Sequence, residues 1–395
     1  MALTEFQTEY VGTRGRLFRL ALTSSLLTVL TLGLYRFWMK TRLRRYYWSA
    51  IRPGGQPLEY VGEPMEKLLG FLIAVVILAF YIGIVNLLLM FLSFSLLQGN
   101  FAAYALSFVG VIPIMFYARY RARRYILART RWRGLRFGMA QGAWGYAGRA
   151  FLHWSITILT LGLLWPRMTF ALEKYRTDRT FFGTGQFVQG GHWQMLYRPF
   201  LPLLAGLVIA GIAVVLASWG SVGQAMLVGA VGTVWALYGL AHYRVHSFRL
   251  LTNTKSLGEI GFRARPRPWR VIRIYVFGNL IVGLLMSLFL TALLAALGGA
   301  VITVAGSSGS FDPMELGANL PVWLSTMAAM LLYFSVFVSW GVFQHVFVTL
   351  PLARHYAQTL DLTGTHHLPA FQQRDRDEFT EAEGFAEALD LGAAI

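Results

Sequence analysis

Residues 68–118, LLGFLIAVVILAFYIGIVNLLLMFLSFSLLQGNFAAYALSFVGVIPIMFYA, contain no Asp, Glu, Lys or Arg in 51 positions, and this stretch decides the fold class. A helix needs about 20 apolar residues to cross a lipid bilayer. The stretch is therefore long enough for two such helices and a turn. The polar segment Ser93–Asn100 is the predicted turn.

Two further stretches repeat the pattern. Pro199–Tyr243 carries no charged residue, and Ile274–Ala353 carries only Asp312 and Glu315. Each is again long enough for two crossing helices. The turns that we expect in them are Ser218–Gln224 and Gly306–Pro321. The three hairpins predict an all-α, polytopic helical membrane protein with six transmembrane helices.

The charges that the chain does carry are unevenly placed. Only 13% of the residues are charged against 56% hydrophobic, and all 35 Lys and Arg lie outside the three apolar stretches. Residues 1–360 hold 33 of the basic residues and 10 of the 18 acids, a net charge of +23. Short loops rich in Lys and Arg stay on the cytoplasmic side. We therefore expect cytoplasmic basic connectors and anionic membrane lipids as partners, and no nucleic-acid partner.

Two shorter apolar segments are harder to place. Leu20–Tyr35 and Ala150–Trp165 have about 16 residues each, which is short for a crossing. Basic residues flank both ends of each segment. We interpret them as re-entrant or interfacial, with Gly33 and Gly162 in their turns; the alternative is a protein with eight spans.

The two short segments are also related to each other. Residues 30–34 and 159–163 share the sequence LTLGL at an offset of 129 positions, which indicates an internal duplication. The predicted organisation is a membrane domain over residues 1–364, in which about 11–140 and 141–260 are related and 261–364 is a partial copy. An acidic cytoplasmic tail, residues 365–395, follows and either docks on the basic face or stays disordered.

A shorter element recurs five times at the helix ends. An aromatic residue is followed 8 to 10 positions later by a glycine, which closes a turn where a positive φ is needed. The pairs are Tyr46–Gly54, Tyr125–Gly134, Tyr175–Gly183, Phe248–Gly258 and Tyr356–Gly364. We interpret this element, called the elbow below, as a structural anchor at the membrane interface.

The opening residues resemble a known family. Gly12–Gly15, the run LLTVLTLGLYRFWMKTRLRRYYWS and Leu58–Tyr60, together with the second copy from Trp132 to Gly138, are similar to the YjgN family of bacterial inner-membrane proteins, a domain of unknown function. The similarity extends from about Val11 to Gly364. It implies a multi-pass protein of the bacterial inner membrane and supplies no activity, substrate or cofactor.

Chemistry is sparse in this sequence. The chain has no cysteine. Its predicted membrane-spanning helices contain no carboxylate, because the acids of the third apolar stretch lie in its predicted turn. His242 and His246 have ligand-like spacing, but no carboxylate is near them in the sequence, so no metal site, cofactor or catalytic residue is predicted. Asn279 and Gln344 are expected to hydrogen-bond between helices.

Two functions remain open at this point. The first is a lipid-interacting envelope or scaffold protein in which Arg44, Arg45, Arg123 and Arg124 contact anionic headgroups. The second is a channel or transporter for a small solute, in which Gly33 and Gly162 belong to half-membrane loops. An enzyme is the third and weakest hypothesis, because no reaction is indicated.

Overall fold

The basic connectors form a ten-stranded antiparallel sheet. The structure is a computed structural model that describes residues 5–80, 83–84, 86–97, 101–305 and 322–374. The strands run in the order β2-β1-β10-β9-β8-β7-β6-β5-β4-β3. They are β1 (Glu5–Tyr10), β2 (Ile51–Pro53), β3 (Leu58–Tyr60), β4 (Thr130–Trp132), β5 (Leu135–Met139), β6 (Thr180–Phe182), β7 (Gly185–Gln189), β8 (Lys255–Leu257), β9 (Ile260–Ala264) and β10 (Leu360–Thr363).

The expectation of an all-α fold is therefore wrong. Most of these strands have only three to five residues, so they carry almost no periodic signal of their own. Their partners are also far away in the sequence, as where Glu5 of β1 lies opposite Thr363 of β10. The two edge strands, β2 and β3, are consecutive in the chain, so the ladder returns on itself as a nearly closed barrel.

Tight turns join the strands within each hairpin. Trp132 lies opposite Leu135, which leaves Arg133 and Gly134 as a two-residue turn. Both turn residues have positive φ, 53° and 79°, the conformation that the right-handed twist of a hairpin favours. The β6–β7 and β8–β9 turns have the same length, because Phe182 pairs with Gly185 and Leu257 with Ile260.

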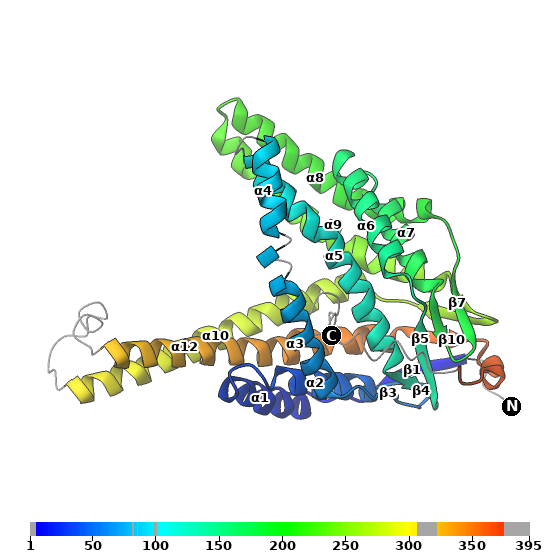
Figure 1. Ribbon diagram of the computed structural model, residues 1–395, viewed down its shortest axis with the longest axis horizontal. Helices are drawn as coiled ribbons and strands as arrows, with labels where there is room; N and C mark the ends of the chain where they lie inside the picture. Colours follow the sequence, from blue (N-terminus) through cyan, green and yellow to red (C-terminus); the bar gives the residue numbers. More distant parts are fainter. Residues whose placement is uncertain (1–4, 81–82, 85, 98–100, 306–321, 375–395) are drawn as a thin grey trace. The chain divides into compact units, whose positions relative to one another are not determined.

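Helices fill every other interval between strands (Figure 1). Each helical excursion leaves one strand and returns to its hydrogen-bonded neighbour in the sheet. The excursions are α1 (Arg14–Leu30) with α2 (Arg36–Ala50); α3 (Pro64–Phe80), α4 (Asn86–Leu97) and α5 (Phe101–Ala128); α6 (Ala143–Leu159) with α7 (Trp165–Thr177); η2 (Trp193–Leu196), α8 (Tyr197–Ser218) and α9 (Val222–Asn253); and α10 (Pro268–Ala305), α12 (Val322–Gln344), η3 (His345–Thr349) and α13 (Leu350–Gln358). A short 3-10 helix, η4 (Thr365–Ala370), follows β10.

Four of the described helical segments are long and apolar enough to cross a membrane, where six were expected. They are Trp193–Ser218, Val222–Asn253, Pro268–Ala296 and Ala329–Gln358. None of the four lies in the first apolar stretch, where α3 has 17 residues, α4 has 12, and residues 81–82, 85 and 98–100 are outside the described part of the chain. The expected turn Gly306–Pro321 lies outside the described residues, as do the last three residues of the turn Ser93–Asn100.

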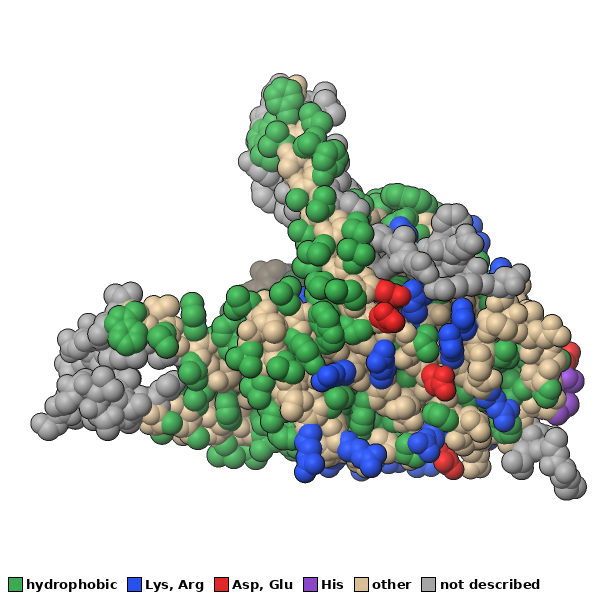
Figure 2. Space-filling view, turned by 60° about the horizontal axis from the view of Figure 1, so that its bottom comes forward, with side chains coloured by type: hydrophobic (Ala, Val, Ile, Leu, Met, Phe, Trp, Pro, Cys, Tyr) green, Lys and Arg blue, Asp and Glu red, His purple; other side chains and the backbone are tan. Residues whose placement is uncertain are grey.

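The helices α8 and α9 pack closely along their length. An added Cβ on Gly206, Gly232 or Gly239 would collide with backbone atoms of the opposite helix. Small residues permit this backbone approach, which is the usual way that helices associate in lipid. The large apolar side chains point outward instead: Val214 and Leu227 are each more than 70% exposed. Figure 2 shows hydrophobic side chains over the projecting helices. The Lys and Arg visible in this view lie away from the ends of those helices.

The chain divides into two compact units. The first takes in Met1–Val11, Arg44–Val271 and His355–Ile395 and contains the whole sheet. Its sheet core includes Trp132, Phe182, Leu257, Ile260, Leu362 and Leu368. The second takes in Gly12–Leu43 and Ile272–Arg354. Within it, Gln344 Nε2 donates to Asn279 Oδ1 at 2.8 Å, which confirms the expected hydrogen bond between two apolar helices.

Candidate functional site

Four of the five elbow glycines lie in turns between consecutive strands, and Gly364 lies between β10 and the short helix η4. Their φ values are 58° at Gly54, 79° at Gly134, 53° at Gly183, 56° at Gly258 and 71° at Gly364. At Gly54, Gly183 and Gly364 an added Cβ would also collide with a neighbour. At Gly183 that neighbour is the carbonyl oxygen of Gln372, and at Gly364 it is that of Glu259. Glycine is thus required there by both conformation and space.

The aromatic residues of the elbows contact neighbouring elements of the protein. Tyr125 is fully buried, and its hydroxyl donates to Glu66 Oε2 at 2.9 Å. The Tyr175 hydroxyl donates to the carbonyl oxygen of Gly142 at 2.9 Å. The remaining elbow aromatics make edge-to-face ring contacts, Tyr46 with Tyr47 and Phe248 with Tyr356.

Arg44 and Arg45 differ in their surroundings. Arg44 is 5% exposed; its guanidinium lies 5.2 Å from the ring centre of Tyr60, and its Nη1 donates to the Tyr60 hydroxyl at 3.3 Å. The ammonium of Lys67 lies 5.0 Å from the same ring centre. Two cations thus lie beside one aromatic ring, whose face attracts positive charge. Arg45 is exposed and donates to the carbonyl oxygen of Gly62 at 3.1 Å.

Arg124 lines a pocket at the C-terminal end of the first apolar stretch. Its Nε donates to the carbonyl oxygen of Met139 at 2.9 Å, and the pocket has a volume of about 420 Å³. Arg121 lines the same pocket and donates from Nη1 to the Tyr117 hydroxyl at 2.9 Å. The ring of Tyr117 lies 4.6 Å from that of Trp144 at the rim. We call this the Arg121–Arg124 pocket.

The electrostatics of this pocket favour an anion. Its lining residues include two arginines and no carboxylate. The N-terminus of α6 also borders the pocket, since Gly142 is the N-cap and the first turn has no acidic residue. A helix N-terminus adds a partial positive charge to the two guanidinium charges. Arg123, the remaining predicted arginine, is instead within electrostatic reach of Glu173.

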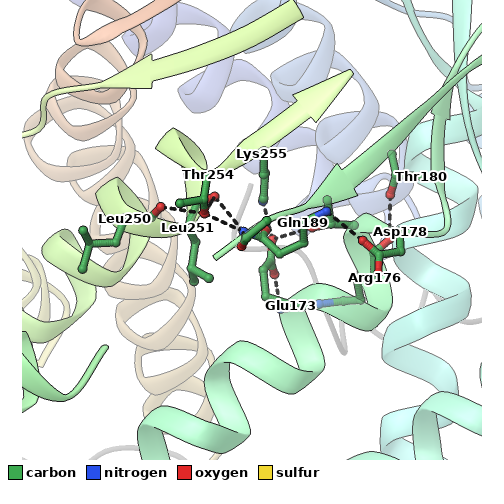
Figure 3. Close-up of polar contacts among 11 residues, drawn as sticks. Glu173, Arg176, Asp178, Thr180, Gln189, Leu250, Leu251, Thr254 and Lys255 are labelled. Atoms are coloured by element: carbon green, nitrogen blue, oxygen red, sulfur yellow. Dashed lines mark hydrogen bonds and ion pairs between the residues drawn. The ribbon is translucent and has the colours of Figure 1, made fainter. Parts of the chain in front are cut away.

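Glu173 is the centre of an ionic network between helix α7 and the start of strand β8 (Figure 3). Arg176 Nη2 lies 2.6 Å from Glu173 Oε2, and Lys255 Nζ lies 2.6 Å from Glu173 Oε1. Burial raises the pKa of the Glu173 carboxyl, but the positive charges of Arg176, Lys255 and Arg123 outweigh it. The resulting pKa lies well below its usual range. The carboxylate is therefore ionised, and its ion pair with Lys255 joins helix α7 to strand β8.

Gln189 continues this network beside Glu173 (Figure 3). Its backbone N–H donates to Asp178 Oδ1 at 2.7 Å, and its side chain donates to Thr254 Oγ1 at 2.8 Å and to the carbonyl oxygen of Leu251 at 3.1 Å. Asp178 also pairs with Lys174 at 3.0 Å. The network holds β7 to the end of α9.

The sequence did not single out Glu66, Glu173, Lys255 or Gln189. Glu66 and Glu173 each lie close to basic residues, but charge patterning alone does not tell a buried pair from a solvated one. The available signal is the scarcity of acids in a strongly basic chain: residues 1–360 contain only 10. An acidic residue in so basic a chain is therefore a candidate for an ion pair with Lys or Arg.

The histidines do not gather into a metal site. The rings of His242 and His246 stack at 4.1 Å, and each ring Nδ1 faces a backbone carbonyl oxygen. Within the part of the chain that the structure describes, no three His, Cys, Asp or Glu side chains come close enough together to hold an ion.

The start of the predicted tail packs on the sheet. Thr184 N donates to the carbonyl oxygen of Gln372 at 2.9 Å, and the Arg136 N–H donates to Gln373 Oε1 at 3.0 Å. The guanidinium of Arg374 lies 4.4 Å from the ring centre of Phe181. The acidic part of the tail, residues 375–395, lies outside the described residues.

Comparison with known families identifies the chain at this level. Residues 5–388 match the family described as "Bacterial protein of unknown function (DUF898)". The chain belongs to this family. The DUF898 match confirms the resemblance to the YjgN family, which is the same group. No curated protein and no solved structure matches the chain.

Proposed function

We propose that this DUF898 protein is a multi-pass protein of the bacterial inner membrane that holds its ten-stranded sheet in the cytoplasm and binds an anionic lipid headgroup there. One observation carries the topology: every helical excursion begins and ends at adjacent strands of one sheet. A hydrogen-bonded sheet cannot lie on both sides of a bilayer, so each excursion crosses an even number of times. All basic connectors then share one side.

The charge distribution supports the cytoplasmic side. Of the consecutive strand pairs β2–β3, β4–β5, β6–β7 and β8–β9, all but β6–β7 carry arginine in their strands or turns, which is the bias of short cytoplasmic segments. The residues that carry it are Arg52, Arg131, Arg133, Arg136 and Arg263. The outward-facing apolar side chains of α8 and α9 supply the lipid-facing surface, because an exposed patch of this size requires a nonpolar surrounding.

The Arg121–Arg124 pocket supports the proposal that a lipid headgroup binds. It begins where the charge-free stretch ends, between Tyr117 and Arg124, which is the level of phosphates in such a topology. Arginine pairs with a phosphate through two parallel hydrogen bonds. Tyr117 and Trp144 at the rim belong to the aromatic class enriched at that depth. Of the four arginines chosen from the sequence, Arg124 alone lines this pocket.

Topology is tested by cysteine accessibility, since the chain has no native cysteine. Arg133→Cys and Glu259→Cys lie in two turns of the sheet, and Trp219→Cys lies at the α8 end of the α8–α9 turn. In intact cells an impermeant maleimide should label only Trp219→Cys; permeabilised cells should expose all three. Labelling of Arg133→Cys or Glu259→Cys from outside would overturn the proposal.

Headgroup binding is tested by lipid retention in native mass spectrometry. Arg121→Gln should lower the retention of phosphatidylglycerol about tenfold or more, because one hydrogen bond to a charged group contributes about 1.5–3 kcal/mol. Arg265→Gln is the matched control: it removes one exposed arginine of the same unit and should leave retention unchanged. Equal retention by the two variants would remove the pocket from the proposal.

The transport alternative gains no support from the glycines on which it rests. A Cβ added to Gly33 or Gly162 would contact nothing within 4 Å. A bulky residue there would therefore not narrow a path through the described part of the protein. Both glycines lie in turns between two helices and have positive φ.

A further inference from the structure

Two helical hairpins end in the same turn. The α1–α2 turn has Leu32 at φ 50° and Gly33 at φ 94°; the α6–α7 turn has Leu161 at φ 49° and Gly162 at φ 87°. Gly33 N donates to the carbonyl oxygen of Thr28 at 2.7 Å, and Gly162 N donates to that of Thr157 at 2.7 Å. The identical hydrogen bonds show one turn design used twice.

The conformation of the two leucines is costly. A residue other than glycine is strained in the left-handed region, and leucine has no polar group with which to offset the strain. Here the strained backbone holds the leucine outward, since Leu32 is 91% and Leu161 is 89% exposed. In water this arrangement combines strain with full hydration of a large apolar side chain. Its presence in two hairpins indicates a surface built for an apolar partner.

Each turn presents three leucines rather than one. Leu30 and Leu159, at the ends of the first helices, are 78% and 82% exposed. Leu34 and Leu163, which complete the two turns, are exposed as well. We call these two sets the leucine tips: Leu30, Leu32 and Leu34 in one, and Leu159, Leu161 and Leu163 in the other.

We propose that each leucine tip inserts into the acyl chains of one bilayer leaflet without crossing into the other. The arginines decide against a crossing: Arg36 is the first residue of α2, and Arg167 is the third residue of α7. A charged side chain is costly inside the hydrocarbon core, so a tip with an arginine this close to it enters only as far as that arginine reaches the phosphates. A long side chain can extend back to the phosphates while the leucines enter shallowly.

The lengths of the first helices agree with a shallow insertion. The helices α1 and α6 have 17 residues each, which at 1.5 Å per residue is about 25 Å, less than the thickness of the hydrocarbon core. Arg149 in α6 has ten residues between it and the turn, which sets about 15 Å as the greatest depth that this tip reaches below Arg149. Lipid is favoured over a protein partner because cations flank both sides of each tip and match anionic headgroups.

This inference rests on the proposed membrane location, and its experiment separates the two. Leu32→Cys and Leu161→Cys carry an environment-sensitive fluorophore in vesicles of phosphatidylglycerol and phosphatidylethanolamine whose acyl chains are brominated at a shallow or a deep carbon. Val208→Cys on α8, exposed and ten residues past Arg198, is the deep reference. Arg133→Cys in a sheet turn is the water reference.

The expected result is loss of fluorescence at both tips with shallow bromines, at Val208→Cys with deep bromines, and at Arg133→Cys with neither. Unquenched tips beside a quenched Val208→Cys would overturn the leucine-tip inference alone. Stronger quenching of the tips by deep bromines would also overturn it, in favour of a crossing. Quenching at one tip only would overturn the shared role. An unquenched Val208→Cys would instead overturn the proposed function.

Discussion

Replacing Glu173 by Gln tests whether the ionic network stabilises the packing of helix α7 on strand β8. The substitution keeps the shape of the side chain and removes its charge. Arg176 and Lys255 then lose a partner that lies 2.6 Å from each. The Glu173 side chain is only 14% exposed, so water replaces the lost interaction poorly. Removing one partner of a buried ion pair costs about 3–5 kcal/mol. We expect a loss of this order in the free energy of unfolding.

The pH dependence follows from the direction of the pKa shift. The folded-state pKa of Glu173 lies below its unfolded value, so the folded state holds the proton less tightly than the unfolded chain. The stabilisation is then fully present above the unfolded pKa, near 4.5, and is lost as the pH falls through the folded pKa. Wild-type protein should therefore lose stability from about pH 5 downward, by an amount that Glu173→Gln does not show.

The assay is thermal unfolding of the detergent-solubilised protein, followed by tryptophan fluorescence at pH 7 and pH 4. The control is Glu5→Gln, which breaks an exposed pair with Arg263 at 3.6 Å and should change stability by less than about 1 kcal/mol. In Glu173→Gln/Lys255→Met the loss should be smaller than the sum of the single losses, because the two residues share one interaction. An unfolding temperature of Glu173→Gln equal to that of Glu5→Gln would refute the reasoning.

Two further substitutions test packing with matched glycines. Gly232→Leu forces a side chain into the backbone of α8 and should cost several times more stability than Gly211→Leu, which has open space around it; equal unfolding temperatures would contradict the close helix packing. Gly183→Ala meets the carbonyl oxygen of Gln372 and should release the segment after β10 to protease, whereas Gly134→Ala, strained but unobstructed, should leave that segment protected; equal digestion rates would show that the contact does not hold it.

The apolar stretches could be recognised from the sequence because their signal is local. A charged side chain in lipid is costly wherever it stands, so the absence of charge over Pro199–Tyr243 predicts α8 and α9 without knowledge of any contact. The same reasoning predicted two crossing helices in Leu68–Ala118, where none of the described segments is long and apolar enough to count as a span. Composition measures how apolar a stretch is, and it does not say where the helix breaks.

The elbow glycines show the limit of a repeated motif. The spacing of Gly134 and Gly183 predicts a turn, and both have the positive φ of a turn. The sequence could not show that these turns join strands, because three-residue strands such as β4 and β6 have no pattern of their own. The arginines predicted as headgroup contacts in the same segments also differ in their surroundings. Arg124 lines a pocket, and Arg44 is buried against Tyr60.

By itself the sequence determined the family, the long apolar helices and the basic connectors, because each of these depends on the character of neighbouring residues in the chain. The tertiary structure alone decided that the connectors form one sheet, since a strand is stabilised by partners such as Thr363 opposite Glu5, hundreds of positions away. It also decided which charges are buried, because Glu173 and Lys255 meet only when β7 and β8 pair.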